Sequence, residues 1–182
     1  TDVLTGKVNP SGKLPVSFPL HYNDVPSSAF FPGEALSDEV VMDAYLNMPR
    51  GKHSQMKHQD GIYVGYRYYD SFAVPVAYPF GYGLSYTSFS YGQPQLSSTS
   101  FHGELTISLE VKNTGKVAGK EVVQLYLTAP ATSMDKPKKE LKAFAKTNVL
   151  APGQSETLQF SLTADQLASY SEQAGRWVAD AG

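Results

Sequence analysis

The clearest pattern in the chain is a strict alternation of apolar and polar residues over positions 105–111. A period of two places alternate side chains on one face of a strand, so this segment is predicted to be a half-buried strand. Turn signals follow it at Asn113-Thr114-Gly115 and at Pro152-Gly153. Further short strands are predicted at residues 122–127, 141–149, 157–162 and 177–178, with one capped helical turn at 165–170. Short strands separated by turns at this spacing indicate an all-β sandwich.

A second pattern is an aromatic stretch over residues 60–91, which holds eight of the 12 tyrosines and three of the nine phenylalanines. Its first part alternates and predicts a strand over residues 62–69, after which prolines and glycines mark turns. Aromatic rings bury large areas, so the stretch must lie against another part of the molecule. Two interpretations stay open, an aromatic clasp between two structural units and a platform for stacking sugar rings. The platform candidates are Tyr63, Tyr66, Tyr68, Tyr69 and Phe80.

The remaining segments carry weaker patterns. An edge strand is predicted at residues 14–18, and a short helix is predicted at residues 36–48 with Ser37 as its N-cap. The acidic residues of this region do not have the spacing of a calcium loop, so they are interpreted as a solvated face: Glu34, Asp38, Glu39 and Asp43. No metal site is predicted. Large side chains expected in or near the sandwich core are Tyr126, Phe144, Phe160 and Trp177.

Composition excludes several classes of function. The net charge of −2 and the pI of about 6.0 give no basic footprint for nucleic acid. No apolar run is long enough for a membrane span, so no membrane partner is predicted. The chain has no cysteine, hence no disulfide and no thiolate chemistry. At 182 residues it can hold one domain with a substantial arm.

Three blocks of sequence resemble glycoside hydrolase family 3, which includes β-glucosidases. Residues 9–19 read NPSGKLPVSFP and resemble the segment that leaves the family's second domain. The clasp region contains YVGYRYYD and YPFGYGLSYTSFSY, which resemble the entry into its last domain. The third block resembles the fibronectin type III-like domain and contains VKNTGKVAGKEVVQLYL, KELKAF and LAPGQSETLQFSL. The blocks fall in family order along nearly the whole chain.

The resemblance implies an all-β, fibronectin type III-like sandwich preceded by an extended, partly irregular arm. Residues 1–19 would be the tail end of an α/β-sandwich domain, residues 20–85 a linker with the aromatic clasp, and residues 86–182 the sandwich, expected to lack its last strand. The chain would then be the C-terminal structural or accessory part of a β-glucosidase-type enzyme. A free-standing carbohydrate- or protein-binding sandwich module is the alternative.

The resemblance also sets expectations for chemistry and partners. The family's catalytic aspartate and glutamate lie in the two upstream domains, so no catalytic, cofactor-binding or metal residue is assigned here, and no cofactor is expected. The expected partners are the upstream catalytic domains of the parent enzyme, a second copy of this chain and a β-glycan. A secreted or periplasmic parent would be ordinary for this family. Sugar specificity would lie in the upstream domains.

Overall fold

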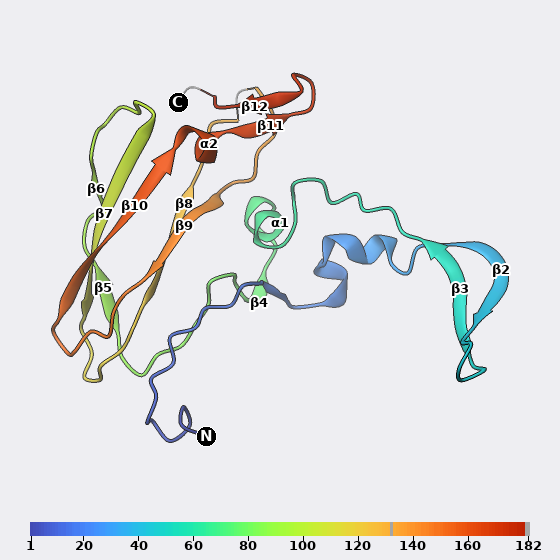
Figure 1. Ribbon diagram of the computed structural model, residues 1–182, viewed down its shortest axis with the longest axis horizontal. Helices are drawn as coiled ribbons and strands as arrows, with labels where there is room; N and C mark the ends of the chain where they lie inside the picture. Colours follow the sequence, from blue (N-terminus) through green and yellow to red (C-terminus); the bar gives the residue numbers. More distant parts are fainter. Residues whose placement is uncertain (132, 181–182) are drawn as a thin grey trace.

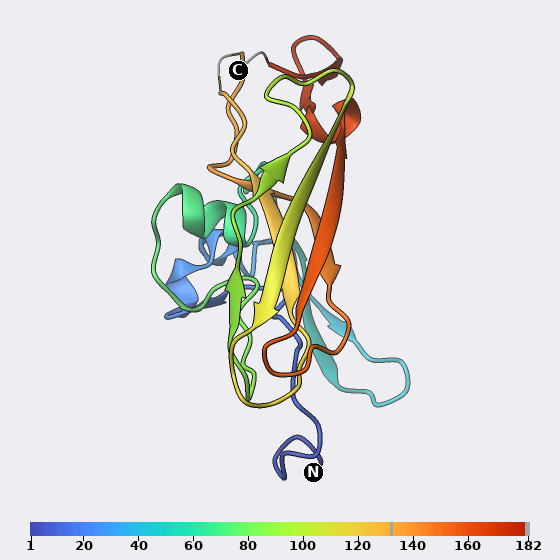
Figure 2. The same ribbon diagram turned by 90° about the vertical axis from the view of Figure 1, so that its left-hand side faces the viewer.

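The structure, a computed structural model, describes residues 1–131 and 133–180, and its C-terminal half is a β-sandwich (Figure 1). One antiparallel sheet has the strand order β10-β7-β5, with β6 also paired to β7. The second sheet consists of β8 and β9 and packs behind the first (Figure 2). The strands are β5 (Phe89–Tyr91), β6 (Gln95–Leu96), β7 (Glu104–Asn113), β8 (Val122–Leu127), β9 (Glu140–Lys146) and β10 (Ser155–Thr163). The predicted all-β sandwich is therefore confirmed.

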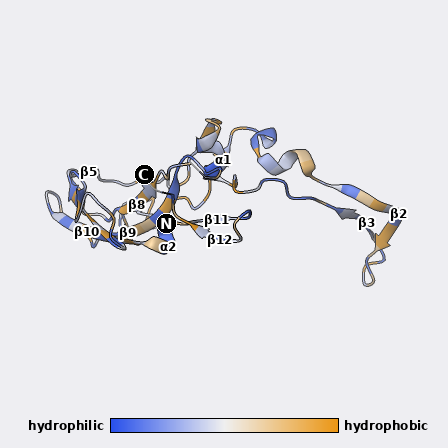
Figure 3. Ribbon diagram, turned by 90° about the horizontal axis from the view of Figure 1, so that it is seen from above, coloured by the Kyte–Doolittle hydropathy of each residue, from blue (hydrophilic) through white to orange (hydrophobic). Residues whose placement is uncertain are grey.

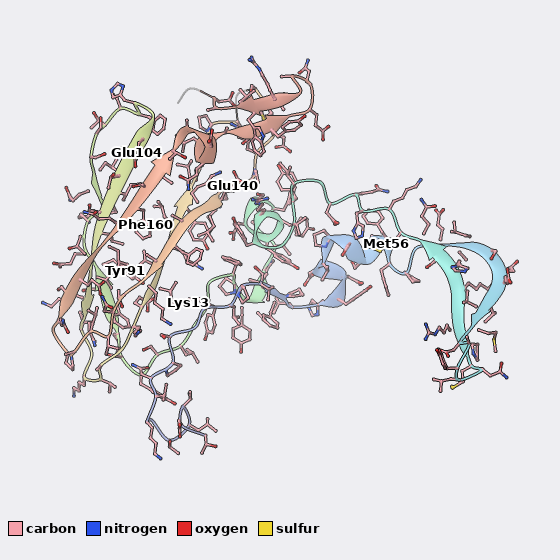
Figure 4. The ribbon with its side chains drawn as sticks, in the orientation of Figure 1. Lys13, Met56, Tyr91, Glu104, Glu140 and Phe160 are labelled. Atoms are coloured by element: carbon pink, nitrogen blue, oxygen red, sulfur yellow. The ribbon has the colours of Figure 1, made fainter. Side chains whose placement is uncertain are left out.

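The core lies between the two sheets and follows the predicted alternation. Ile107 faces Phe160 across β7 and β10, and Leu109 faces Leu158. The buried apolar cluster comprises Ile107, Val111, Val123, Leu150, Leu158, Phe160 and Leu162. Figure 4 shows Phe160 on β10, on the side of that strand that faces β8 and β9. Along β10 these side chains alternate with more exposed ones, and on β7 Ile107 and Val111 are buried at alternate positions, so the strand phase inferred from the sequence is correct for these two strands.

Three of the four large side chains expected in or near the core lie elsewhere. Phe160 is buried in the core, as predicted, whereas Tyr126 is half-buried on the outer face of β8 against Tyr66. Phe144 is 71% exposed and Trp177 is 67% exposed. On β9 the small residues Ala143 and Ala145 pack against the core, so the intervening Phe144 points away from it. Trp177 belongs to a separate two-stranded hairpin formed by β11 (Ser169–Ser171) and β12 (Arg176–Val178).

The arm before the sandwich differs from the prediction in several places. Residues 36–48 do not form a helix, because β2 (Glu34–Met42) and β3 (Pro49–Gln55) form an antiparallel hairpin. This hairpin projects far from the sandwich (Figure 3). The predicted strand at residues 62–69 is also wrong over its whole length. Residues 62–65 form turn and irregular structure, and α1 (Tyr66–Ser71) begins after Gly65 at a φ of 60°. A positive φ is favourable for glycine and breaks an extended run.

Asp43 is not part of a solvated face, in contrast to the prediction. It is buried in the turn between β2 and β3, where its Oδ1 accepts hydrogen bonds from the backbone N–H of Leu46 (2.9 Å) and of Tyr45 (2.8 Å). Arg50 Nε donates to Oδ2 over 2.6 Å. The Leu46 and Tyr45 amides, together with Arg50, lower the pKa of the Asp43 carboxyl. The carboxylate therefore organises a turn.

The remaining elements are short. The edge strand predicted at residues 14–18 is reduced to β1 (Phe18–Pro19), which pairs with β4 (Val76–Tyr78). The 3-10 helices η1 (Tyr22–Asp24) and η2 (Pro26–Phe30) follow β1. The helical turn predicted at residues 165–170 is the shorter α2 (Ala164–Leu167), capped by Thr163 together with Gln166, and residues 169–170 belong to β11. Among the described residues, no helix is long and apolar enough to cross a membrane.

A fully buried asparagine joins the turns at one end of the sandwich. The side chain of Asn113 donates from Nδ2 to the carbonyl oxygens of Val117 and Leu150, both over 2.8 Å. Its Oδ1 accepts hydrogen bonds from Thr87 Oγ1 (2.6 Å) and from the backbone N–H of Gly115 (3.0 Å). Four partners from three separate segments of the chain thus depend on one amide.

A buried ion pair holds the other end. Lys136 Nζ lies 2.8 Å from Asp180 Oδ2, with both side chains buried, and Ser133 Oγ donates to Asp180 Oδ1. These hydrogen bonds, from Lys136 first and then Ser133, lower the pKa of Asp180 to about 2. The pair attaches residues 133–137 to the segment that follows β12.

Replacing Asn113 should destabilise the sandwich strongly. Asn113→Ala leaves buried polar groups without partners, so the free energy of unfolding should fall by about 2–4 kcal/mol. The urea midpoint measures this loss. Asn148→Ala serves as a control, because Asn148 is exposed and its side chain forms a hydrogen bond with Glu156 at the surface. Equal midpoints for the Asn113 variant and the parent chain would contradict the role assigned to this amide.

The Asp180 pair should make stability depend on pH in the acid range. Because the folded-state pKa is depressed, the ionised carboxyl stabilises the fold above its ordinary pKa of about 4 and loses that effect as the pH falls toward 2. Asp180→Asn should therefore lower the melting temperature at neutral pH, and the gap to the parent chain should narrow between pH 4 and pH 2.

The matched control is Asp2→Asn, since Asp2 is exposed. It should leave the melting temperature unchanged across this range. A gap for Asp180→Asn that stays constant from pH 7 to pH 2 would show that the carboxyl's charge is irrelevant.

Candidate functional site

The aromatic clasp, defined here as residues 60–86, packs against the outer face of the β8–β9 sheet. α1 lies beside this sheet (Figure 1). The ring centroid of Tyr66 lies 4.8 Å from that of Phe80 and 5.8 Å from that of Tyr126 on β8. The backbone N–H of Leu141 donates to Tyr66 Oη over 2.7 Å, so the hydroxyl also has a partner on β9. Tyr66 thus joins the arm to the sandwich through both its ring and its hydroxyl.

The five aromatic residues considered for a sugar platform are occupied by packing inside the clasp. Tyr69 is buried, and the other four are partly buried. Tyr63 and Tyr68 both pack their rings on Phe72, with centroids 4.9 Å and 5.2 Å apart. The contacts of these five residues therefore fit the clasp interpretation. The aromatic rings that are exposed to solvent belong to other residues.

Polar contacts surround this aromatic packing. Arg67 of α1 pairs with Glu140 of β9 over 3.0 Å, and Asp70 pairs with Lys139 over 3.1 Å. Tyr63 Oη donates to Asp135 Oδ1 over 2.7 Å, and this hydrogen bond to a carboxylate raises the pKa of Tyr63. Partly exposed ion pairs contribute little stability each, so their effect here is to fix the orientation of α1 on the sandwich.

The segment NPSGK, which resembles part of the family's second domain, joins this assembly through Asn9. Asn9 Oδ1 accepts hydrogen bonds from the Tyr86 backbone N–H (2.8 Å) and from Ser85 Oγ (3.0 Å), and its Nδ2 donates to the Ala118 carbonyl (3.0 Å). A Cβ at Gly119 would lie 2.6 Å from Asn9 Nδ2, so this close approach requires glycine. Nearby, Lys13 forms an ion pair with Glu121 over 2.7 Å. Sequence reasoning did not identify these contacts.

Several carboxylates of this region could be considered as catalytic acids or bases, but they are paired with basic or amide groups. Glu140 contacts Arg67 and Lys142, and Glu156 accepts hydrogen bonds from Asn148. The pKa values of Asp43 and Asp180 are lowered, whereas a general acid requires a raised carboxyl pKa. Within the described residues, no group of three side chains is arranged to bind a metal ion.

One face of the arm is an apolar groove of 710 Å³. Its apolar side chains come from both ends of the arm: Phe18, Tyr78, Tyr82 and Leu84 are exposed, and Leu14 is half-buried. A second cavity of 510 Å³ lies nearby, between η2 and α1. Asp60 lines it, and the buried Oδ1 of this carboxylate has no hydrogen-bond partner among the described residues. Contiguous exposed apolar surface of this kind is typical of a contact face.

Family models match most of the chain. The model of the glycosyl hydrolase family 3 C-terminal domain matches residues 1–86, and that of the fibronectin type III-like domain matches residues 121–182. A β-glucosidase of Bacteroides ovatus is 38% identical over 187 aligned residues, and a thermostable β-glucosidase B of Acetivibrio thermocellus is 39% identical over 183. Each alignment covers the whole of this chain and 22% of the relative.

Solved structures give the same result. β-Glucosidase 3B from Thermotoga neapolitana, in complex with glucose, is 46% identical with a TM-score of 0.82, and a β-glucosidase from Bifidobacterium adolescentis is 34% identical with a TM-score of 0.83. Both alignments cover the whole of this chain. They cover 23% of the Thermotoga neapolitana chain and 24% of the Bifidobacterium adolescentis chain. The chain thus spans about a fifth to a quarter of the relatives it matches. The chain belongs to glycoside hydrolase family 3. It corresponds to the C-terminal part of these enzymes, including the fibronectin type III-like domain.

Proposed function

We propose that the parent protein hydrolyses terminal β-glucosides and that this chain supports the reaction without supplying a catalytic carboxyl group. The observation that carries this proposal is the full-length match to β-glucosidases several times longer. Glycoside hydrolysis needs two carboxyl groups on opposite sides of the scissile bond, about 5–5.5 Å apart in a retaining enzyme. The catalytic pair is assigned to the remainder of the parent, and the site residues of this chain are structural.

The apolar groove of the arm is the surface on which the remainder of the parent would dock. It lies beside the short β1–β4 sheet, on the part of the chain matched by the family 3 model. The buried Asp60 Oδ1 would take a hydrogen-bond donor from the same partner, because a buried carboxylate oxygen without a donor is costly. The sandwich and the clasp would hold this face in one orientation.

Activity should depend on residues outside this chain. The purified chain should release no nitrophenol from nitrophenyl β-glucoside, whereas β-glucosidase 3B of Thermotoga neapolitana assayed in parallel serves as the active control. Turnover that rises in proportion to the chain and disappears in Glu140→Gln or Asp165→Asn would disprove the assignment.

A chimera tests the docking role directly. Replacing the matching segment of the Thermotoga neapolitana enzyme with this chain should retain β-glucosidase activity, since the two are 46% identical over the whole segment. Leu84→Asp in the groove should then lower the melting temperature and activity of the chimera, because it buries a charge at the contact. Tyr45→Asp, on the distal hairpin, is the matched control. Equal effects of the two substitutions would contradict docking through the groove.

Without the remainder of the parent, the groove should promote self-association of the chain. Exposed apolar patches associate, and β8 pairs with β9 alone among the described strands, which leaves an edge for strand addition. Sedimentation velocity should show the average mass rising with concentration. The Leu84→Asp variant should shift this rise to higher concentration. A chain that sediments as a monomer at about 1 mM would contradict this expectation.

A further inference from the structure

Two exposed aromatic rings stand on the hairpin formed by β11 and β12. Tyr170 is 52% exposed and Trp177 is 67% exposed, although the two strands pair these residues directly. Their ring centroids lie 5.7 Å apart, with an angle of 72° between the planes. Both line one cavity of 490 Å³. This volume falls in the range of about 300–1,000 Å³ that is typical of small-molecule sites.

Polar side chains line the rest of the cavity. Glu140 and Lys142 come from the beginning of β9, Asp165 and Gln166 from α2, and Arg67 from α1. Figure 4 shows Glu140 on β9, between the sandwich and α1. The cavity therefore lies where the part of the chain matched by the family 3 model meets the fibronectin type III-like domain.

The charges of this cavity are largely neutralised within the protein. Glu140 lies 3.0 Å from Arg67 and 3.1 Å from Lys142, and the buried Lys136 is paired with Asp180. An ionic ligand would have to compete with these pairs. An uncharged polyhydroxylated ligand would instead add hydrogen bonds to carboxylate oxygens and to guanidinium and amide N–H groups that keep their present partners.

The walls of the cavity are held in place by contacts outside it. Lys136 and Ser133 fasten the segment Met134–Pro137 to the end of β12, which carries Trp177. Tyr63 of the clasp donates to Asp135 from the opposite side. Two independent anchors thus fix this segment, which forms the cavity wall between the aromatic pair and α1. Because the wall is already ordered, binding a ligand costs little conformational entropy.

We propose that this cavity is a binding site for a neutral oligosaccharide. The rings of Trp177 and Tyr170 pack against the C–H faces of sugar rings, and Glu140, Arg67 and Gln166 exchange hydrogen bonds with sugar hydroxyls. The aromatic platform considered from the sequence therefore lies on the β11–β12 hairpin and not on the clasp. The choice of β-linked glucose as the first probe rests on the proposed function.

The chain carries its own reporter for this site, because Trp177 is its only tryptophan. Cellotetraose should change the tryptophan emission with saturation, and calorimetry should give the same dissociation constant. Tyr170→Ala should weaken binding about tenfold or more through loss of ring contact. Glu140→Gln, which preserves shape, should weaken it less. Tyr45→Ala removes a fully exposed ring on the distal hairpin and should leave the affinity unchanged.

Maltotetraose is the second probe. Saturable binding of maltotetraose alone supports the site and counts against the β-glucoside preference of the proposed function, so the two proposals can fail separately. The site is disproved if neither sugar changes the emission up to about 10 mM, or if Tyr170→Ala binds as well as the parent chain. It is also disproved if the emission changes with protein concentration alone, because a second copy then covers the aromatic pair.

Discussion

The packing of Tyr66 between Phe80 and Tyr126 is the contact on which the arrangement of the two halves depends. A two-stranded sheet has two faces, and the first sheet of the sandwich covers only one face of β8–β9. Gln124 and Tyr126 point from the other face toward the clasp, where Tyr126 meets Tyr66 and Gly81 approaches the Gln124 side chain closely. Side chains of this size would be exposed if the clasp were absent. The clasp thus acts as a third layer of the sandwich.

Burial is distributed unevenly along the chain as a result. The buried apolar core lies between residues 107 and 162, and in the arm Tyr69 is the buried apolar residue among those described. The arm therefore derives its order from contact with the sandwich, through rings in the middle and through Asn9 and Lys13 at one end. A polypeptide segment that buries so little of its own apolar surface cannot offset the entropy of ordering alone. Its exposed groove is consistent with a surface completed by another part of a larger enzyme.

The sandwich could be read from the sequence because its signals are local. Alternation along β7 and β10 fixes both the strands and their inward faces, and the turns are marked by glycine, asparagine and proline. Residue type alone places Phe144 in the core, whereas the strand phase gives the inward positions to Ala143 and Ala145. The pattern at residues 36–48 favoured a helix because acidic residues followed a serine. The actual hairpin depends on Asp43 and on β-branched Val40 and Val41, whose pairing partners lie beyond the predicted helix.

The oligosaccharide cavity cannot be predicted from local sequence patterns. Its lining comes from α1, the segment before β9, β9 itself, α2 and the β11–β12 hairpin, which are brought together by the tertiary fold alone. Trp177 was assigned to the core because tryptophan is usually well buried, and only the paired register of the hairpin shows that its ring stands beside that of Tyr170. The same clasp that shields the outer face of β8–β9 also supplies Arg67 and holds Asp135. One set of contacts therefore fixes the orientation of the arm and shapes the cavity, so a ligand bound there would stabilise the junction between the two halves of the chain.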